Sequence, residues 1–215
     1  MLKHIAVIAD GNRRWAKQRH LPTGLGYMQG LVTIENLCEW AIAAKIPYLT
    51  VYCFSTENWK RPPVEVNMIM SIGRDYGLKK EWYVNRNIHV QFYGRTDRLE
   101  KDIVHTCREI EIATQHCDTL NLTICLDYGG KNEIITAIQN GITTEEEMDE
   151  YMTRFFPNPD IILRTGGEYR LSNFLMWQSA YSELFFIDTL FPDLTDEIMN
   201  TIVTNFEKRK RNYGG

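Results

Sequence analysis

The chain has 215 residues, of which 24 are basic and 28 are acidic, so its formal net charge is -4 at pH 7. This length fits one domain of ordinary size with a sizeable buried core, and we expect a single domain over residues 1–215. A negative net charge gives no general attraction to nucleic acid or to anionic lipid, so we expect no nucleic-acid partner and only local recognition of phosphate.

The beginning of the sequence shows no sorting or membrane-spanning pattern. Lys3 and His4 precede an apolar run of five residues, which is too short for a secretory signal, and no apolar run is long enough to span a bilayer. The five cysteines form an odd number without a Cys-x-x-Cys pair, which is typical of reduced thiols. We therefore expect a cytoplasmic protein without a transmembrane segment, whose membrane contact is peripheral at most.

The first predicted strand, residues 5–9, runs into Asp10-Gly11-Asn12-Arg13-Arg14-Trp15. The pattern predicts a buried strand that stops at a turn, with Asn12 capping a helix over about 13–19. The free amides of a helix start and the Arg14 guanidinium favour phosphate oxygens, whereas Asp10 repels them unless a divalent cation such as Mg²⁺ lies between. The alternative is an Asx turn at Asp10 and a solvated charge at Arg14, so the rest of the chain must decide.

Helices and strands alternate along the remaining sequence. Strands are predicted over 48–54, 88–93, 120–126 and 160–163, and helices over about 28–44, 64–85, 97–117, 133–139, from Thr144 onward, and 196–211. The helix over 64–85 is interrupted by Gly73-Arg74-Asp75-Tyr76-Gly77. This alternation predicts an α/β fold with a mostly parallel central sheet flanked by helices.

Polar loops follow four of the predicted strands. They are residues 10–14, 55–61, 127–131 and 164–172, which together carry arginines, glycines, hydroxyls and asparagines. The carboxyl ends of parallel strands meet at one edge of the sheet, where ligands of such folds bind. The convergence favours a site for more than one phosphate group, with a cation near Asp10.

The same loops resemble a known family. The segments are Asp10-Gly11-Asn12-x-Arg14-Trp15-Ala16, Phe54-Ser55-x-Glu57-Asn58-Trp59-x-Arg61-Pro62, Tyr128-Gly129-Gly130, and the run from Ile162 to Phe186 that contains Arg164-Thr165-Gly166-Gly167-Glu168-x-Arg170-Leu171-Ser172. They look like the cis-prenyltransferases, the undecaprenyl diphosphate synthase family, and the similarity covers nearly the whole chain in the right order.

The resemblance implies a homodimeric α/β protein with an apolar tunnel, which condenses an allylic diphosphate with isopentenyl diphosphate and uses Mg²⁺. It implies that Asp10 engages the metal, with Glu183 as a second carboxylate. It places the allylic diphosphate against Gly11, Asn12, Arg13, Arg14, Trp15, Thr23 and Tyr27. It places the reaction centre at Ser55, Asn58, Trp59 and Arg61, where Asn58 or Ser55 assists proton removal. It places isopentenyl diphosphate against Arg164, Arg170 and Ser172. Structural alternatives are an ion network of Arg164 and Arg170 with Glu168 and Glu183, and a capping role for Asn58.

This chain departs from the family on the allylic side and along the tunnel. Thr23 and Tyr27 stand where Arg and His are usual, Asp127 where Asn is usual, and Tyr169 where His or Gln is usual. The C-terminal Arg-x-Gly appears as Asn212-Tyr213-Gly214.

Arg74 and Asp75 fall on the helix that lines the tunnel, and unpaired charges in an apolar tunnel are costly. We therefore expect a short product. The alternatives are irregular head-to-middle joining, as in lavandulyl-type members, and a non-catalytic subunit of a prenyltransferase complex.

Overall fold

The computed structural model of the protein describes residues 2–77 and 79–209. Within them, six strands form one sheet in the order β3-β4-β2-β1-β5-β6, and every neighbouring pair is parallel. The strands are β1 His4–Ile8, β2 Tyr48–Ser55, β3 Ile88–Tyr93, β4 Leu120–Tyr128, β5 Ile161–Arg164 and β6 Glu183–Phe186. The predicted α/β fold with a parallel central sheet is confirmed. The short edge strand β6 was not predicted.

Helices connect the strands. They are α1 Asn12–Gln18, α2 Thr23–Ala43, α3 Pro63–Ile72, α4 Lys80–Asn85, α5 Lys101–Thr114, α6 Gly130–Gln139, α7 Glu145–Met152 and α8 Asp196–Glu207, with short turns η1 Thr56–Lys60, η2 Gly73–Gly77 and η3 Phe191–Asp193. Thr144 caps α7 as predicted, in a capping box with Glu147. The predicted cap at Asn12 is wrong. Gly11 occupies that position, and Asn12 is the first residue of α1.

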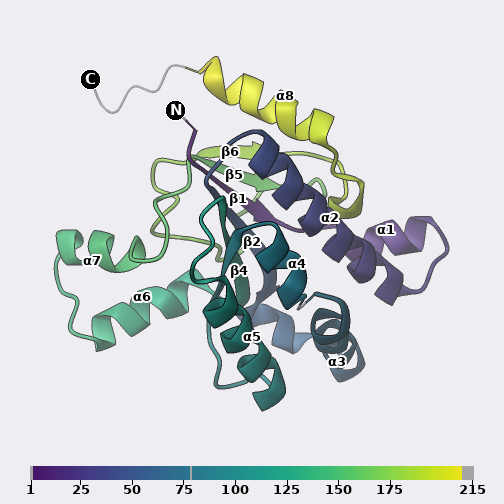
Figure 1. Ribbon diagram of the computed structural model, residues 1–215, viewed down its shortest axis with the longest axis horizontal. Helices are drawn as coiled ribbons and strands as arrows, with labels where there is room; N and C mark the ends of the chain where they lie inside the picture. Colours follow the sequence, from purple (N-terminus) through teal and green to yellow (C-terminus); the bar gives the residue numbers. More distant parts are fainter. Residues whose placement is uncertain (1, 78, 210–215) are drawn as a thin grey trace.

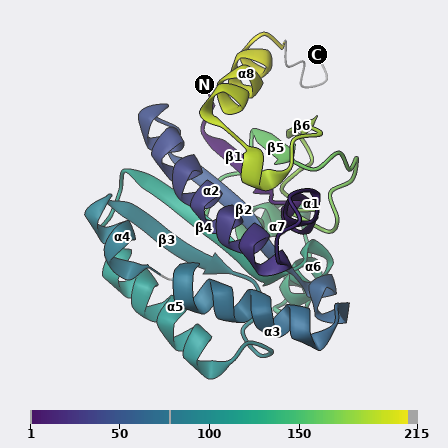
Figure 2. The same cartoon turned by 90° about the vertical axis from the view of Figure 1, so that its right-hand side faces the viewer.

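The sheet is covered on both faces. Alternate residues of β1 face opposite sides: Ile5 and Val7 join the larger core under α2, α4 and α8, whereas Ala6 and Ile8 join a core with Phe156 and residues 174–175. Figure 1 shows α6 and α7 on the opposite side of the sheet from α2 and α8. Figure 2 shows α2 lying along the sheet, with α8 toward the β5 and β6 end and α3 and α5 toward the β3 end.

The interrupted stretch of the 64–85 prediction is a π-helical turn, η2, between α3 and α4. Its charges do not enter the interior. Arg74 pairs with Asp75, Glu100 and Asp102, and all four side chains are more than a third exposed. The expectation of buried charge at Arg74 and Asp75 is therefore wrong, because α5 supplies acidic partners at the surface.

The order of the strands creates a crevice. The chain leaves β1 toward β2, whereas β5 on its other side continues to β6. In open parallel sheets, ligands bind where connections diverge in this way, outside the carboxyl ends of the strands. The crevice lies between the loops that follow β1 and β5, which begin near Asp10 and Arg164. No helix in the described ranges is long and apolar enough to cross a membrane. Asn212, Tyr213 and Gly214 lie outside these ranges.

Candidate active site at the carboxyl end of the sheet

A polar cleft of about 670 Å³ occupies this crevice. Twelve of the residues predicted for the site line it: Asp10, Gly11, Asn12, Arg13, Arg14, Tyr27, Ser55, Asn58, Arg61, Arg164, Arg170 and Ser172. They come from α2 and from the ends of β1, β2 and β5, so three of the four predicted loops converge. The fourth, residues 127–131, does not line the cleft. Its Gly130 and Lys131 amides donate to Asn173 and thereby fix the loop after β5.

Asp10 and Arg164 form the centre of the cleft. Arg164 Nη2 donates to Asp10 Oδ2 over 2.8 Å, and Arg14 Nη2 donates to Asp10 Oδ1 over 3.1 Å. The Arg164 side chain is only 5% exposed, whereas that of Asp10 is 31% exposed. Arg164 Nη1 also donates to the Arg170 carbonyl and to Ser172 Oγ, whereas Arg164 Nε is buried and has no partner among the described residues. In this pair the Arg164 cation is buried and held in place, whereas the Asp10 carboxylate is accessible to a ligand.

The loop after β5 approaches Asp10 closely because it contains two glycines. Gly166 has a φ of +87°, and a Cβ there would lie 2.5 Å from Arg14 Nη2 and 3.1 Å from the Asp10 carbonyl oxygen. The Gly166 carbonyl accepts from Arg14 Nη1 over 2.6 Å. The backbone of this loop thus holds Arg14 against the cleft. Arg170 is less buried than Arg164, since its side chain is 59% exposed, and it pairs with Glu168.

Asn12 contributes a free acceptor. Its Nδ2 donates to the Ala9 carbonyl over 3.1 Å, while its Oδ1 is buried and has no partner within the described ranges. Gly30 of α2 leaves room for this side chain, since a Cβ there would lie 2.5 Å from Oδ1. A buried, unpaired oxygen is costly unless a ligand or solvent group bonds to it. A water molecule or another donor would have to bond to Asn12 Oδ1, because diphosphate oxygens only accept hydrogen bonds.

The loop after β2 is fixed by its own side chains. The Ser55 amide donates to Asn58 Oδ1 over 3.1 Å, and the two residues form a capping box at η1. The alternative of a capping role for Asn58 is thus realised, but it caps η1, and the residue lines the cleft as well. The part of Asn58 in proton removal stays a prediction.

Arg61 ends in a cluster that was not predicted as a whole. Arg61 Nη1 donates to the Tyr27 hydroxyl over 2.7 Å and to Glu65 Oε1 over 2.9 Å, and Tyr27 donates to Glu65 over 2.9 Å. Arg13 pairs with the other oxygen of Glu65 over 3.2 Å. Burial acts to raise the pKa of Glu65, but the Tyr27 hydroxyl and the two arginines outweigh it and lower that pKa. The Arg-x-x-x-Glu spacing of residues 61 and 65 was the available signal for Glu65.

Four of the predicted site residues lie away from the cleft. Trp15 donates to Asp193 over 2.7 Å and Trp59 to Asp127 over 2.9 Å. Thr23 is exposed at the start of α2. Glu183 pairs with Arg209, and β6 aligns it with Ile161 at the amino end of β5. Glu183 thus begins a strand at the opposite end of the sheet from Asp10.

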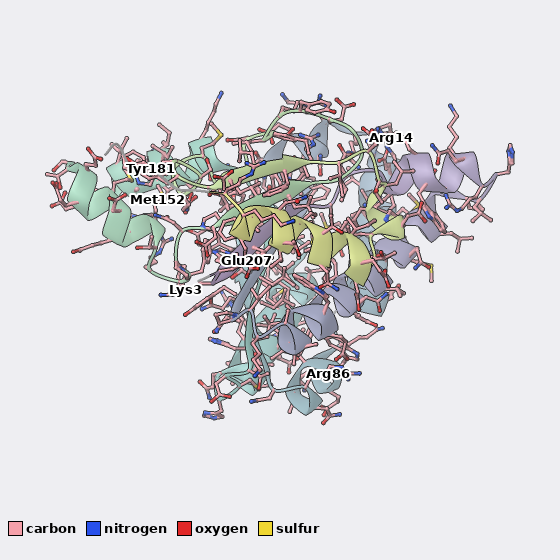
Figure 3. The ribbon with its side chains drawn as sticks, turned by 90° about the horizontal axis from the view of Figure 1, so that it is seen from above. Lys3, Arg14, Arg86, Met152, Tyr181 and Glu207 are labelled. Atoms are coloured by element: carbon pink, nitrogen blue, oxygen red, sulfur yellow. The ribbon has the colours of Figure 1, made fainter. Side chains whose placement is uncertain are left out.

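Two residues at which the chain departs from the family also lie outside the cleft. Asp127 is fully buried and pairs with Arg98 as well as with Trp59. Tyr169 is 74% exposed, and its ring lies 5.5 Å from that of Phe186. Figure 3 places Arg14, beside the cleft, on the far side of the molecule from Tyr181 and Met152. The cleft therefore lies at one side of the molecule.

An apolar cavity of about 130 Å³ adjoins the cleft. Its walls include Leu31, Ile34, Phe54, Met70, Phe92, Ile103 and Leu126, from α2, β2, α3, β3, α5 and β4. Ala9, Asn12, Tyr27, Cys53 and Ile69 line both spaces, so these five residues form the neck between them. A charged cleft that opens onto an apolar cavity suits a ligand with an anionic head and a hydrocarbon tail.

The side chains present fit Mg²⁺ only together with an anionic ligand. In the described part of the chain, no three His, Cys, Asp or Glu side chains are grouped to hold a metal ion. Mg²⁺, however, is commonly held by one or two carboxylates plus substrate phosphates. Phosphate oxygens in the cleft would take over the donors of Arg14 and Arg164 and release the Asp10 carboxylate for a cation. Asp10 is thus the residue that would hold the metal.

Comparisons with known proteins agree with this geometry. Residues 8–214 match the family described as putative undecaprenyl diphosphate synthase. The isoprenyl transferase of Wolinella succinogenes is 42% identical over 225 residues, which cover 100% of this chain and 97% of the relative. That of Aquifex pyrophilus is 39% identical, with 99% and 95% covered.

Two solved structures share the fold over nearly their whole length. A probable undecaprenyl diphosphate synthase from Campylobacter jejuni has a TM-score of 0.85 and 34% identity, with 100% of this chain and 99% of that chain covered. Lavandulyl diphosphate synthase from Lavandula x intermedia, in complex with dimethylallyl diphosphate, has a TM-score of 0.90 and 27% identity, with 99% and 98% covered. The chain therefore belongs to the isoprenyl transferase family of undecaprenyl diphosphate synthase and its relatives, as the resemblance of its motifs indicated.

Proposed function

We propose that the protein condenses an allylic diphosphate with isopentenyl diphosphate in a Mg²⁺-dependent reaction and releases a short-chain isoprenyl diphosphate. The single observation that carries the proposal is the union of an arginine-lined cleft with an apolar cavity through one shared neck. Both substrates have a diphosphate head and an apolar tail. The Lavandula relative is known in complex with dimethylallyl diphosphate, a ligand of this class.

The cleft offers two groups of anion donors. Arg14 and the start of α1 follow β1, whereas Arg164, Arg170 and Ser172 belong to the end of β5 and the loop after it. We assign the allylic diphosphate to the first group and isopentenyl diphosphate to the second. In the reaction, the C–O bond to the allylic diphosphate breaks, the double bond of isopentenyl diphosphate forms the new C–C bond, and a proton leaves the product. Bound Mg²⁺ supplies charge neutralisation at the departing diphosphate.

The chain's own residues prepare these steps. Arg14 and Arg164 are already directed at the Asp10 carboxylate, so their donors are in place before a diphosphate arrives, and such preorganisation is worth several kcal/mol. Ser55 and Asn58 line the cleft at the end of β2 and are the groups assigned to assist proton removal.

The short product is proposed from the size of the apolar space. The apolar cavity measures about 130 Å³ against about 670 Å³ for the cleft. The charges of Arg74 and Asp75 do not support a short product, because they are paired at the surface. A second candidate is irregular head-to-middle joining of two short diphosphates, favoured by the likeness to lavandulyl diphosphate synthase.

A second carboxylate for the cation would come from another copy of the chain. Glu183 lies three residues before the end of β6, or about 10 Å along the strand from the carboxyl edge, so it does not reach Asp10 in its own chain. We therefore extend the proposal to a homodimer in which Glu183 of one copy serves the cleft of the other. Mixing inactive Asp10→Ala and Glu183→Ala proteins should restore part of the activity, because a mixed dimer keeps one complete site. No recovery after subunit exchange would contradict a shared site.

The test of the function is product analysis. The protein is incubated with Mg²⁺, isopentenyl diphosphate and, in turn, dimethylallyl, geranyl and farnesyl diphosphate, and the products are identified by mass spectrometry. We expect a short isoprenyl diphosphate. A long polyprenyl product would contradict the short-product proposal, and a branched product from dimethylallyl diphosphate alone would establish head-to-middle joining. Absence of any product would favour a non-catalytic subunit.

A further inference from the structure

Tyr27 differs from the other residues of the neck. All five line both the apolar cavity and the polar cleft, but the side chain of Tyr27 also bonds through its hydroxyl to Arg61, which lines the cleft. The ring therefore spans the boundary, with its polar end on the side of the charged groups. Any tail that extends from a diphosphate in the cleft into the apolar cavity must pass this ring.

The ring is held from two directions. Its hydroxyl donates to Glu65 of α3 over 2.9 Å and accepts from Arg61 Nη1 over 2.7 Å. Because Arg13 of α1 also pairs with Glu65, this neck cluster of Arg13, Tyr27, Arg61 and Glu65 ties α1, α2 and α3 together. Because its hydroxyl both donates and accepts a hydrogen bond, the Tyr27 side chain is held in one rotamer. The ring therefore has a fixed position in the neck.

The hydroxyl also fixes the charge state of the aperture. Burial raises the pKa of Tyr27 to about 12, although the charge of Arg61 acts to lower it. A tyrosine with its ordinary pKa of 10 is already neutral at physiological pH, and burial keeps it so, which means that the ring presents no charge to an apolar tail. The same hydroxyl holds one nitrogen of Arg61, which leaves the rest of that guanidinium for a ligand in the cleft.

We propose that Tyr27 is the specificity-determining residue of the neck: its ring limits the size of the allylic tail that enters the apolar cavity, and its hydroxyl positions Arg61. The inference rests on the proposed function. The favoured ligands are allylic diphosphates with short tails. Ring and hydroxyl have separable effects, since Tyr27→Phe removes only the hydroxyl, whereas Tyr27→Ala also removes the ring.

The test measures binding and turnover for dimethylallyl, geranyl and farnesyl diphosphate, with calorimetry in the absence of isopentenyl diphosphate for the binding step. Tyr27→Phe should weaken binding of all three by a similar factor of about ten, because Arg61 loses the hydroxyl that positions its guanidinium for a diphosphate in the cleft. Tyr27→Ala should in addition shift the ratio of kcat/KM for farnesyl over dimethylallyl diphosphate upward by about tenfold or more, since a pocket discriminates roughly this much per methylene group.

Tyr151→Phe in α7 is the matched control. Its hydroxyl accepts from Asn140 over 3.5 Å, and Tyr151 is not among the residues that line the cleft or the cavity, so binding and selectivity should not change. Tyr27→Val, which keeps an apolar side chain but removes most of the ring's volume, replaces the alanine variant if that one unfolds, and circular dichroism checks that each protein is folded. If the wild type binds these diphosphates while Tyr27→Ala keeps its selectivity, the inference is overturned. If the wild type binds none, the proposed function itself fails.

Discussion

The two ends of β1 are both polar, but they use their polar groups differently. At the amino end, His4 is fully buried, and both ring nitrogens are engaged, one with the Pro157 carbonyl and one with Thr50 Oγ1. Asp160 accepts from the Lys3 and His4 amides beside it. The bonding capacity at this end is consumed by the fold.

At the carboxyl end, bonding capacity remains. In the part of the chain that the structure describes, Asn12 Oδ1 and Arg164 Nε are buried without partners, and the Asp10 carboxylate is partly open to the cleft. Natural proteins leave few such groups unpaired. The difference teaches that polarity alone does not mark a site. The site is the end where side chains are held in place with bonds still to make.

The largest expected effect follows from Asp10→Asn. The substitution keeps an acceptor for the arginines but removes the charge that holds a cation, so we expect turnover to fall by about a thousandfold. Steady-state rates at saturating substrates measure the effect. They are corrected for the folded fraction from urea unfolding, because the substitution leaves the buried Arg164 cation with a neutral partner and lowers the free energy of unfolding. Turnover within tenfold of the wild type would refute the assigned role of Asp10.

Arg164→Met and Arg170→Met form a matched pair. Both should weaken isopentenyl diphosphate binding, but only the first removes a buried cation that contacts Asp10, Ser172 and the Arg170 carbonyl. We expect Arg164→Met to lower the free energy of unfolding by about 3 kcal/mol and Arg170→Met by less than about 1 kcal/mol. Urea unfolding of both proteins decides. Equal destabilisation would mean that Arg164 is no more structural than its exposed neighbour.

Groups at the amino end of β1 should affect the pH dependence of the free energy of unfolding and not the activity. Burial lowers the pKa of His4 to about 4, although the Pro157 carbonyl acts to raise it. Between this value and the ordinary value near 6.5, the unfolded chain binds the extra proton, so stability falls as pH falls. Lowering the pH from 7 to 5 should therefore cost about 2 kcal/mol of unfolding free energy from this residue. His4→Gln should flatten that part of the pH profile, and an unchanged slope would contradict the assignment.

The sequence supported the backbone of the site better than its side chains. Alternating apolar runs located β1 to β5, and parallel pairing then required residues 10–14, 55–61 and 164–172 to share one edge. Side-chain direction depends on partners distant in sequence. Trp15 bonds to Asp193 and Trp59 to Asp127, and the residues next to them in the sequence do not indicate either bond. The strand β6 is four residues long and lies in an aromatic stretch without clear alternation, so pairing with β5 decides its structure.

The smallest effect is expected at Arg74, which tests whether the distinction between the two ends of β1 also holds beside the apolar cavity. Arg74 lines part of that cavity, yet its guanidinium bonds to Asp75, Glu100 and Asp102 at the surface. The donors of Arg74, like the ring nitrogens of His4, already bond to other residues of the protein. Arg74→Met should therefore leave product length unchanged, as judged by mass spectrometry. Exposed pairs contribute little, so the urea midpoint should not move measurably either. A longer product from this variant would show that the Arg74 charge, and not the size of the cavity, limits the chain.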